Sequence, residues 1–201
     1  GNIIGSASAS SIDVLWAGPG TGTVSLTQTS AWGCDSSVSA NVSIVPTPKP
    51  VIVLPNDTAC ENKILSYSLA TPTAGHAYAW SVSGGSIIGS SSGTSINVLW
   101  AGPGTGTVSV NQTSSFGCAS SVSENILIIQ TPKPVIVLAN DSTCENKIAS
   151  YSITPVAGES YAWSVSGGNI IGSASASSID VLWAGPGTGT VSLTQTSAWG
   201  C

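Results

Sequence analysis

The sequence contains neither arginine nor methionine, and it has few charges of either sign. Charged residues make up 6% of the 201 residues, and four lysines against nine acidic residues give a formal net charge of −5. An acidic chain without arginine has no basic surface for nucleic acid or for anionic lipid. We therefore expect neither as a partner.

Long apolar runs are also missing. No segment reaches the roughly 18 uninterrupted apolar residues of a membrane helix, so we expect no membrane insertion. The low charge does not indicate disorder, because hydrophobic residues make up 41% of the chain, which is far more than a disordered chain contains. Gly1 falls inside a repeated pattern, so we expect any targeting signal to lie outside these residues.

The sequence is built from a repeat. Residues 1–34 recur unchanged at 168–201, and a near-copy at 85–118 matches at 25 of 34 positions. The basic period is 83 or 84 residues and the perfect period is 167. Such self-similarity is typical of a tandem array of small structural units.

The repeat divides the chain into three parts. We expect a complete unit at 48–131, the C-terminal part of a truncated unit at 1–47, and a unit without its last strand at 132–201. The two partial units share 34 identical residues, so they do not simply complement each other into one domain. An excised piece of a longer polymer accounts for this arrangement.

Within each unit the periodicity is that of β-strands. Tyr78, Trp80 and Val82 alternate with small residues, which places one apolar face inward. Glycine and proline separate the apolar segments. Trp80 and its counterpart Trp163 are predicted to be buried on the third strand. Seven short strands favour an antiparallel, immunoglobulin-like β-sandwich in each unit of about 84 residues. In the complete unit the predicted strands lie at 51–54, 63–70, 77–83, 86–89, 95–101, 105–114 and 121–130.

A family resemblance rests on YAWSVSGGSIIG (78–89) and SINVLWAGPGTGTVSVNQTSSFGC (95–118). These segments resemble the PKD-like and Ig-like repeats of giant surface proteins in Bacteroidetes, among them gliding adhesins. PKD domains proper carry Trp-x-Phe-Gly-Asp-Gly where this chain has Trp80-Ser-Val-Ser-Gly-Gly, so the branch is divergent. The resemblance implies tandem β-sandwiches on a bacterial cell surface, acting as stalks, as spacers or as adhesive, sugar-binding modules.

The resemblance also suggests a modification. Asp57-Thr58-Ala59 and Asp141-Ser142-Thr143 match a three-residue O-glycosylation signal of Bacteroidetes. This makes Thr58 and Ser142 candidate O-glycosylation sites. The alternative is an Asx-type turn between the first two strands.

Catalytic chemistry has little support. Acid–base or nucleophilic catalysis needs a positioned base, most often histidine. The single histidine, His76, is replaced by Glu159 in the next repeat, so we interpret this position as an exposed loop residue. Residues 102–106 are glycine-rich but lack the lysine and helix of a phosphate-binding loop. We predict no enzyme and no cofactor.

One cluster of side chains that carry oxygen ligands is a candidate calcium site. Asn56, Asp57 and Glu61 recur in the next repeat, and calcium prefers such ligands. Because two carboxylates are few for a tight site, no metal ligand is predicted.

The five cysteines lack metal-type Cys-x-x-Cys pairs and indicate disulfides made in an oxidising compartment. A bond from Cys60 to Cys118 would stay within one unit, but a strand of about 9 residues separates their loops by roughly 30 Å. A disulfide needs Cα atoms within about 7 Å. Units stacked end to end bring Cys60 near Cys201 instead, and we favour that inter-repeat bond. Cys34, Cys118 and Cys144 then pair with repeats outside these residues.

These observations favour a structural segment of an extracellular stalk, fibre or adhesin. Its partners are the neighbouring repeats and other copies in a fibre, and the proline-rich linkers at 46–50 and 132–134 predict stiff joints. The alternative is a glycan- or surface-binding adhesive module. Its candidate contacts are Trp32, Phe116 and Trp199, which we otherwise expect to pack against the neighbouring unit. An accessory domain of a secreted enzyme has the least support.

Overall fold

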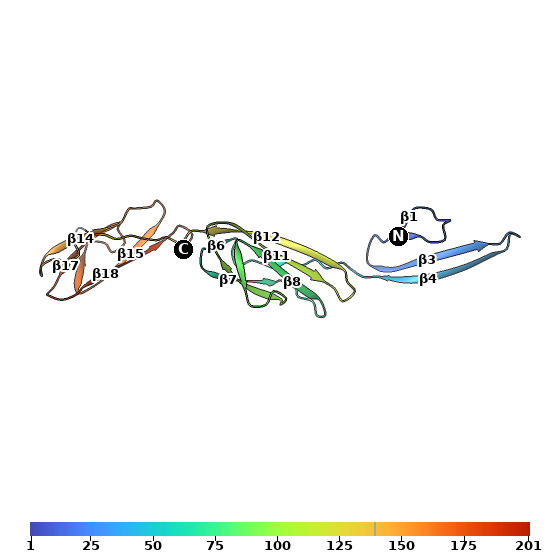
Figure 1. Cartoon of the computed structure of the whole chain (residues 1–201), viewed down its shortest axis with the longest axis horizontal. Helices are drawn as coiled ribbons and strands as arrows, with labels where there is room; N and C mark the ends of the chain where they lie inside the picture. The colour runs from blue at the N-terminus through green and yellow to red at the C-terminus, as the bar shows by residue number, and fades with distance from the viewer. Residues whose placement is uncertain (139) are drawn as a thin grey trace.

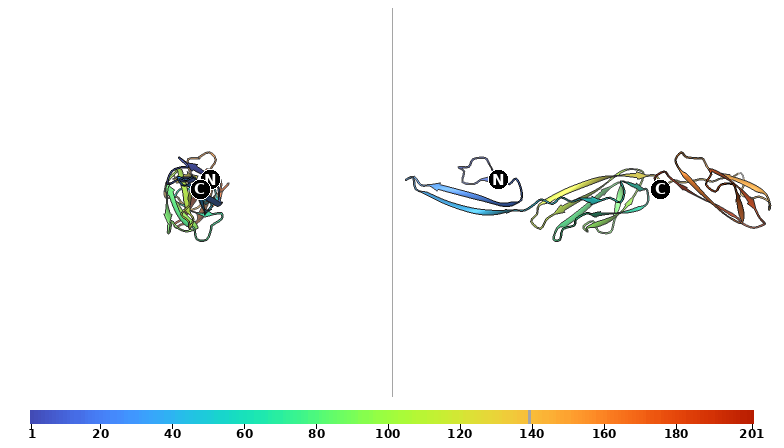
Figure 2. Two further views of the ribbon diagram at one scale, coloured as in Figure 1. Left: turned by 90° about the vertical axis from the view of Figure 1, so that its right-hand side faces the viewer. Right: turned by 180° about the vertical axis from the view of Figure 1, so that it is seen from behind.

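The computed structural model describes residues 1–138 and 140–201, and strands are its only regular elements there. The all-β prediction is thus confirmed. Three units follow one another in a row (Figure 1), and the row is narrow when viewed along its long axis (Figure 2). Within the described residues, no helix has the length and apolar character needed to cross a membrane.

The middle unit is a sandwich of two four-stranded sheets. The first sheet has the order β5 (Ile52–Val53), β7 (Ile64–Leu69), β10 (Ser95–Trp100), β9 (Gly85–Ile88). The second has the order β6 (Thr58–Cys60), β12 (Ala119–Ile129), β11 (Gly104–Thr113), β8 (Ala77–Ser83). All seven strands predicted for this unit are present within a few residues of their expected bounds.

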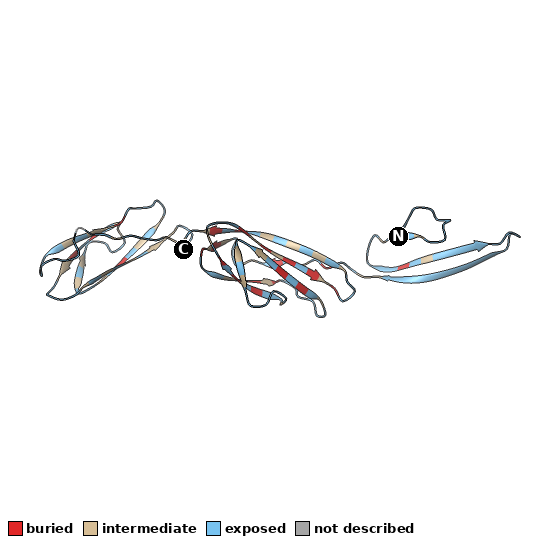
Figure 3. Ribbon diagram, viewed as in Figure 1, coloured by how far each residue is buried: buried red, intermediate tan, exposed pale blue. Residues whose placement is uncertain are grey.

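Strand alternation builds the core between these sheets. Val98, Val108 and Ile126 are fully buried, and each such side chain contributes about 1.5–3 kcal/mol relative to exposure. Trp80 is buried as predicted, and its Nε1 donates a hydrogen bond of 2.8 Å to the carbonyl oxygen of Gly93. Figure 3 shows that the buried residues concentrate in the middle unit.

The strand β6 is not among the strands predicted from the sequence. This three-residue strand runs parallel to β12 and pairs Thr58 with Leu127 and Ala59 with Ile128. Ala59 is buried. A strand this short has no visible periodicity, and its partner lies far away in the sequence.

The third unit repeats the first sheet in full. Its strands are β13 (Val137–Leu138), β14 (Ile148–Ser152), β17 (Ser178–Trp183) and β16 (Gly168–Ile171), in that order. In the part of this unit that the structure describes, the second sheet holds β15 (Ser160–Ser166) and β18 (Thr190–Thr196). Trp163 is buried as predicted, in a core with Ile153, Ile179 and Val181.

The first unit consists of two strand pairs. One is β1 (Asn2–Ile4) with β2 (Asp13–Leu15), and the other is β3 (Gly20–Thr29) with β4 (Asp35–Ile44). The β3–β4 hairpin is long and mostly exposed, including Leu26 and Val38. Its apolar side chains therefore lie largely uncovered.

Candidate functional site at the joint between repeats

A disulfide joins the middle unit to the third unit. Cys60 in β6 and Cys201 after β18 are bonded at an S–S distance of 2.04 Å, with 5.5 Å between their Cα atoms and 141 positions between them in sequence. Figure 1 shows the C-terminus beside β6, at the junction of the two units. End-to-end stacking of the units predicts this pair in preference to Cys60–Cys118.

A tight turn positions Cys201 for this bond. We call it the cysteine turn, and it comprises residues 197–201, with copies at 114–118 and 30–34. The Ser197 N–H donates to the Cys201 carbonyl oxygen at 2.7 Å, and the Cys201 N–H donates to Ser197 Oγ at 3.0 Å. Gly200 has φ of 81°, a conformation that glycine adopts without steric cost. The turn thus fixes the cysteine at the tip of the unit.

Glu61 holds the linker that leaves the middle unit. The residue is 5% exposed, and its Oε1 accepts a hydrogen bond of 3.2 Å from the Thr131 N–H. The Thr131 hydroxyl donates to the Glu61 carbonyl oxygen at 3.1 Å. Lys133 Nζ lies 3.9 Å from Oε1, but this lysine is exposed and its contribution is small. Cys60 and Glu61 therefore attach two different segments to one edge of the middle unit.

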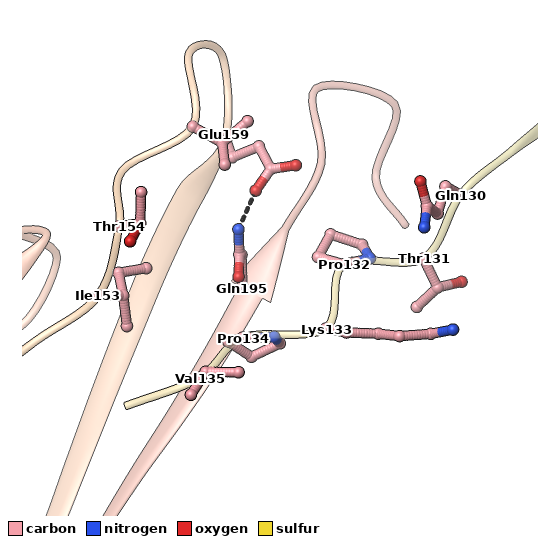
Figure 4. Close-up of a pocket in the computed structure, with 11 residues that line it drawn as sticks. Gln130, Thr131, Pro132, Lys133, Pro134, Val135, Ile153, Thr154, Glu159 and Gln195 are labelled. Carbon is pink, nitrogen blue, oxygen red and sulfur yellow. Dashed lines mark hydrogen bonds between the residues drawn. The ribbon is translucent and has the colours of Figure 1, made fainter. Parts of the chain in front are cut away.

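A cavity of about 480 Å³ lies where the linker meets the third unit. In Figure 4 the linker residues 130–135 form one side, and the hydrogen-bonded pair Glu159–Gln195 lies on the other. The cavity separates linker and sandwich at this joint, so the disulfide and Glu61 provide the firm contacts.

His76 lies in a loop as predicted, but it is half-buried, so the prediction that it is exposed is wrong. Its Nδ1 lies 2.7 Å from Nε2 of the buried Gln112 in β11. The matching pair in the third unit is Glu159 with Gln195. An imidazole nitrogen and a carboxylate oxygen can both accept from a glutamine amide. This shared acceptor role explains why the residue can change between repeats.

The aromatic residues of the cysteine turns stay exposed. Trp32, Phe116 and Trp199 are 93%, 75% and 61% exposed. Trp199 belongs to the turn whose cysteine is bonded to the middle unit, so its neighbour is present and still does not bury it. The packing interpretation is therefore wrong for Trp199, because the joint engages Cys201 and leaves the indole accessible.

The other predicted positions take no part in these contacts at the joint. Thr58 is half-buried in β6, whereas Ser142 is exposed and outside any strand. Cys34 and Cys144 are exposed free thiols, and Cys118 is a half-buried one.

The calcium alternative finds no support in the described residues, where no three acidic, histidine or cysteine side chains gather as a metal site. The carboxylate of Glu61 is hydrogen-bonded to the linker instead. This role of Glu61 was not predicted. The sequence gives one indication of this role: in both copies of the repeat a glutamate follows the cysteine, and a threonine precedes Pro-Lys-Pro.

The model of the PKD-like domain family matches residues 46–128 and 130–201. The chain belongs to this family. No curated protein matches the sequence. The sequence Trp80-Ser-Val-Ser-Gly-Gly, which differs from the motif of PKD domains proper, is therefore compatible with membership of the PKD-like family.

Solved structures similar to this PKD-like chain include the following three. The mixed-linkage glucan utilization locus protein SGBP-B of Bacteroides ovatus, in complex with a heptasaccharide, is 15% identical, with a TM-score of 0.32 over 77% of this chain and 45% of that one. Murine CEACAM1b is 10% identical, with a TM-score of 0.32 over 73% and 92%. A putative membrane-anchored protein of Corynebacterium diphtheriae is 10% identical, with a TM-score of 0.28 over 90% and 55%. Likeness this low transfers no function.

Proposed function

We propose that this chain is a structural, non-enzymatic segment of an extracellular stalk, fibre or adhesin on a bacterial cell surface. The observation that carries the proposal is the doubly attached joint, in which the Cys60–Cys201 bond and the Glu61–Thr131 contacts hold two units in a row. A joint held at two points resists bending, whereas a bare linker acts as a hinge.

The chemistry of the joint supports stiffness. The loop closed by the disulfide spans 141 positions, which corresponds to about 5 kcal/mol in a chain-entropy treatment. Proline at 132 and 134 restricts the linker to extended conformations. The result is a rod whose length increases by a constant step per repeat.

The same bond supports an extracellular location. Disulfides persist in oxidising surroundings, such as the outside of a bacterium. Resemblance to the repeats of giant Bacteroidetes surface proteins supports the same assignment.

Small-angle scattering and negative-stain electron microscopy test the proposal. We expect the oxidised chain to be an extended rod with one preferred angle between the middle and third units. Cys201→Ser should widen the distribution of that angle. Cys34→Ser, which removes an exposed free thiol, should leave the distribution unchanged. A compact particle, or equal broadening in both variants, contradicts the proposal.

A second function, glycan binding, is favoured by one observation: Trp199 is 61% exposed at a completed joint. An exposed indole offers a flat apolar face on which a sugar ring can stack. Glycan-array binding that is lost in Trp199→Ala but kept in Tyr161→Phe would support this function. Binding that survives Trp199→Ala contradicts it.

A further inference from the structure

The first sheet of the middle unit carries uncovered aliphatic side chains on the side that faces away from the core. Ile64, Ile88 and Leu99 are 56%, 44% and 38% exposed. They lie on neighbouring strands, and strand alternation places them on one side of the sheet. We call this surface the outer face. In the middle unit it comprises Ile64, Ser66, Ser86, Ile88, Asn97 and Leu99.

The third unit presents the same surface with one difference in charge. Its strands β14, β17 and β16 have the register of β7, β10 and β9, and all four strands of this sheet are present in both units. At the centre of the face, Asp180 takes the place of Asn97. Ile148 and Ile171 are exposed beside it. The outer face of the third unit comprises Ile148, Ser150, Asn169, Ile171, Asp180 and Leu182.

A serine fixes the central polar side chain in both units. Ser66 Oγ donates to Asn97 Oδ1 at 2.6 Å, and Ser150 Oγ donates to Asp180 Oδ1 at 2.6 Å. The Asn97 Nδ2 group then has two N–H donors without a partner among the described residues, and Asp180 Oδ2 is a free acceptor there. The two faces therefore carry complementary groups at matching positions.

We propose that the outer face of the middle unit docks on the outer face of the third unit in a second copy of this chain. The Asn97 amide of one copy donates to the Asp180 carboxylate of the other, a charge-assisted hydrogen bond. The aliphatic side chains around these two residues pack between the sheets, as inward-facing side chains do in a sandwich. Covering them removes apolar surface from water, which favours the contact.

Charge determines which faces match. Two faces of the third unit would bring two Asp180 carboxylates together without a counter-charge, which is unfavourable. Two faces of the middle unit would oppose N–H donors to N–H donors. The mixed pair places a donor against an acceptor. The position alternates along the chain as Asp13, Asn97 and Asp180, following the perfect period of 167. A second copy supplies both kinds of face, so it is the occupant that this chemistry fits.

The inference deepens the proposed fibre role and rests on it, because the docking joins one row of units to another at its side. The test of the docking reports association between molecules. The test of the proposed function reports the angle between units within one molecule. Either proposal can therefore fail while the other stands.

Sedimentation velocity over a range of protein concentrations tests the docking, with the free thiols alkylated beforehand to prevent intermolecular disulfides. We expect reversible association of the unaltered chain. Asn97→Asp should raise the dissociation constant about tenfold or more, because two carboxylates would then face each other. The double variant with Asn97→Asp and Asp180→Asn exchanges donor and acceptor and should associate like the unaltered chain. Each substitution installs a pair with serine that the other unit already contains, so the fold should be retained.

A second pair of variants tests the aliphatic part of the contact. Ile64→Lys should raise the dissociation constant about tenfold or more, because docking would bury a charge without a partner. Leu127→Lys adds the same charge at an exposed aliphatic position of the other sheet and should associate like the unaltered chain.

The docking is wrong if the unaltered chain stays monomeric at every concentration, or if Asn97→Asp associates as well as the unaltered chain. It is also wrong if the double variant does not recover association, or if Ile64→Lys and Leu127→Lys have equal effects.

Discussion

Gly106 lies so close to Trp100 that a β-carbon on this glycine would be 2.2 Å from Cζ3 of the indole ring. The same approach occurs between Gly22 and Trp16 and between Gly189 and Trp183. The second glycine of each Gly-Thr-Gly segment therefore provides the space in which the tryptophan ring rests against the next sheet.

We expect Gly106→Ala to destabilise the middle unit by about 1–3 kcal/mol, because the added methyl group displaces a packed ring. Gly102→Ala is the matched control, since a β-carbon there would have no atom within 4 Å. Urea unfolding followed by tryptophan fluorescence measures both. Equal effects of the two substitutions would show that the close approach is not what requires glycine.

Tyr67 supports the same tryptophan through its hydroxyl group. Tyr67→Phe leaves Trp100 Nε1 buried without an acceptor, which should cost about 1–3 kcal/mol. Tyr151→Phe in the third unit is the control, because Trp183 Nε1 already lacks a partner there in the described residues. Calorimetry of the two variants should show a lower unfolding temperature for the first and a smaller change for the second.

Alkaline pH should weaken the middle unit. Burial raises the pKa of Tyr67 above its ordinary value of 10.0, and the hydrogen bond from Trp100 lowers it in part. The folded state therefore retains this proton where the unfolded state loses it, so the stabilisation is complete below pH 10 and declines as pH rises through the folded pKa. Unfolding free energies measured across this range should decrease less steeply in Tyr67→Phe. An unchanged slope would contradict the assignment to Tyr67.

Removing the Glu61 carboxylate should free the linker. In Glu61→Ala the Thr131 N–H loses a charged acceptor, an interaction of about 1.5–3 kcal/mol. We expect faster hydrogen exchange at the Thr131 amide and a wider angle between units. Glu145→Ala changes the equivalent exposed glutamate of the third unit and should leave Thr131 unaffected.

The disulfide can be mapped directly. Cleavage after Lys63 and Lys147 of the oxidised Cys34→Ser chain should yield residues 1–63 linked to 148–201. A link between 1–63 and 64–147, which contains both Cys118 and Cys144, would instead contradict the Cys60–Cys201 bond. Mass spectrometry without reduction distinguishes the two.

Most of the fold could be predicted because the strands of each unit alternate strictly and are separated by glycine and proline. The sandwich, its strand positions and the buried Trp80 all follow from that local pattern. The short strand β6 could not be predicted, since its pairing with β12 depends on a contact almost 70 residues away.

The joint was predictable only in part. The end-to-end argument favours Cys60–Cys201 because strand length separates Cys60 from Cys118. The role of Glu61 was missed, because its partner Thr131 is 70 positions distant and carboxylates near a turn also suit calcium. The exposure of Trp199 depends on how small the contact between the two units is at the joint. The periodicity of the sequence carries no information about the size of that contact.

The position of Cys60 near the start of its unit has a mechanical consequence. When an array is pulled from its ends, tension enters the middle unit near residue 48 and can pass to the next unit through the Cys60–Cys201 bond. Only residues 48–60 then carry the load, and fully stretched they span at most about 45 Å. The rest of the sandwich lies outside the line of force. An array clamped in this way can resist pulling without unravelling its domains.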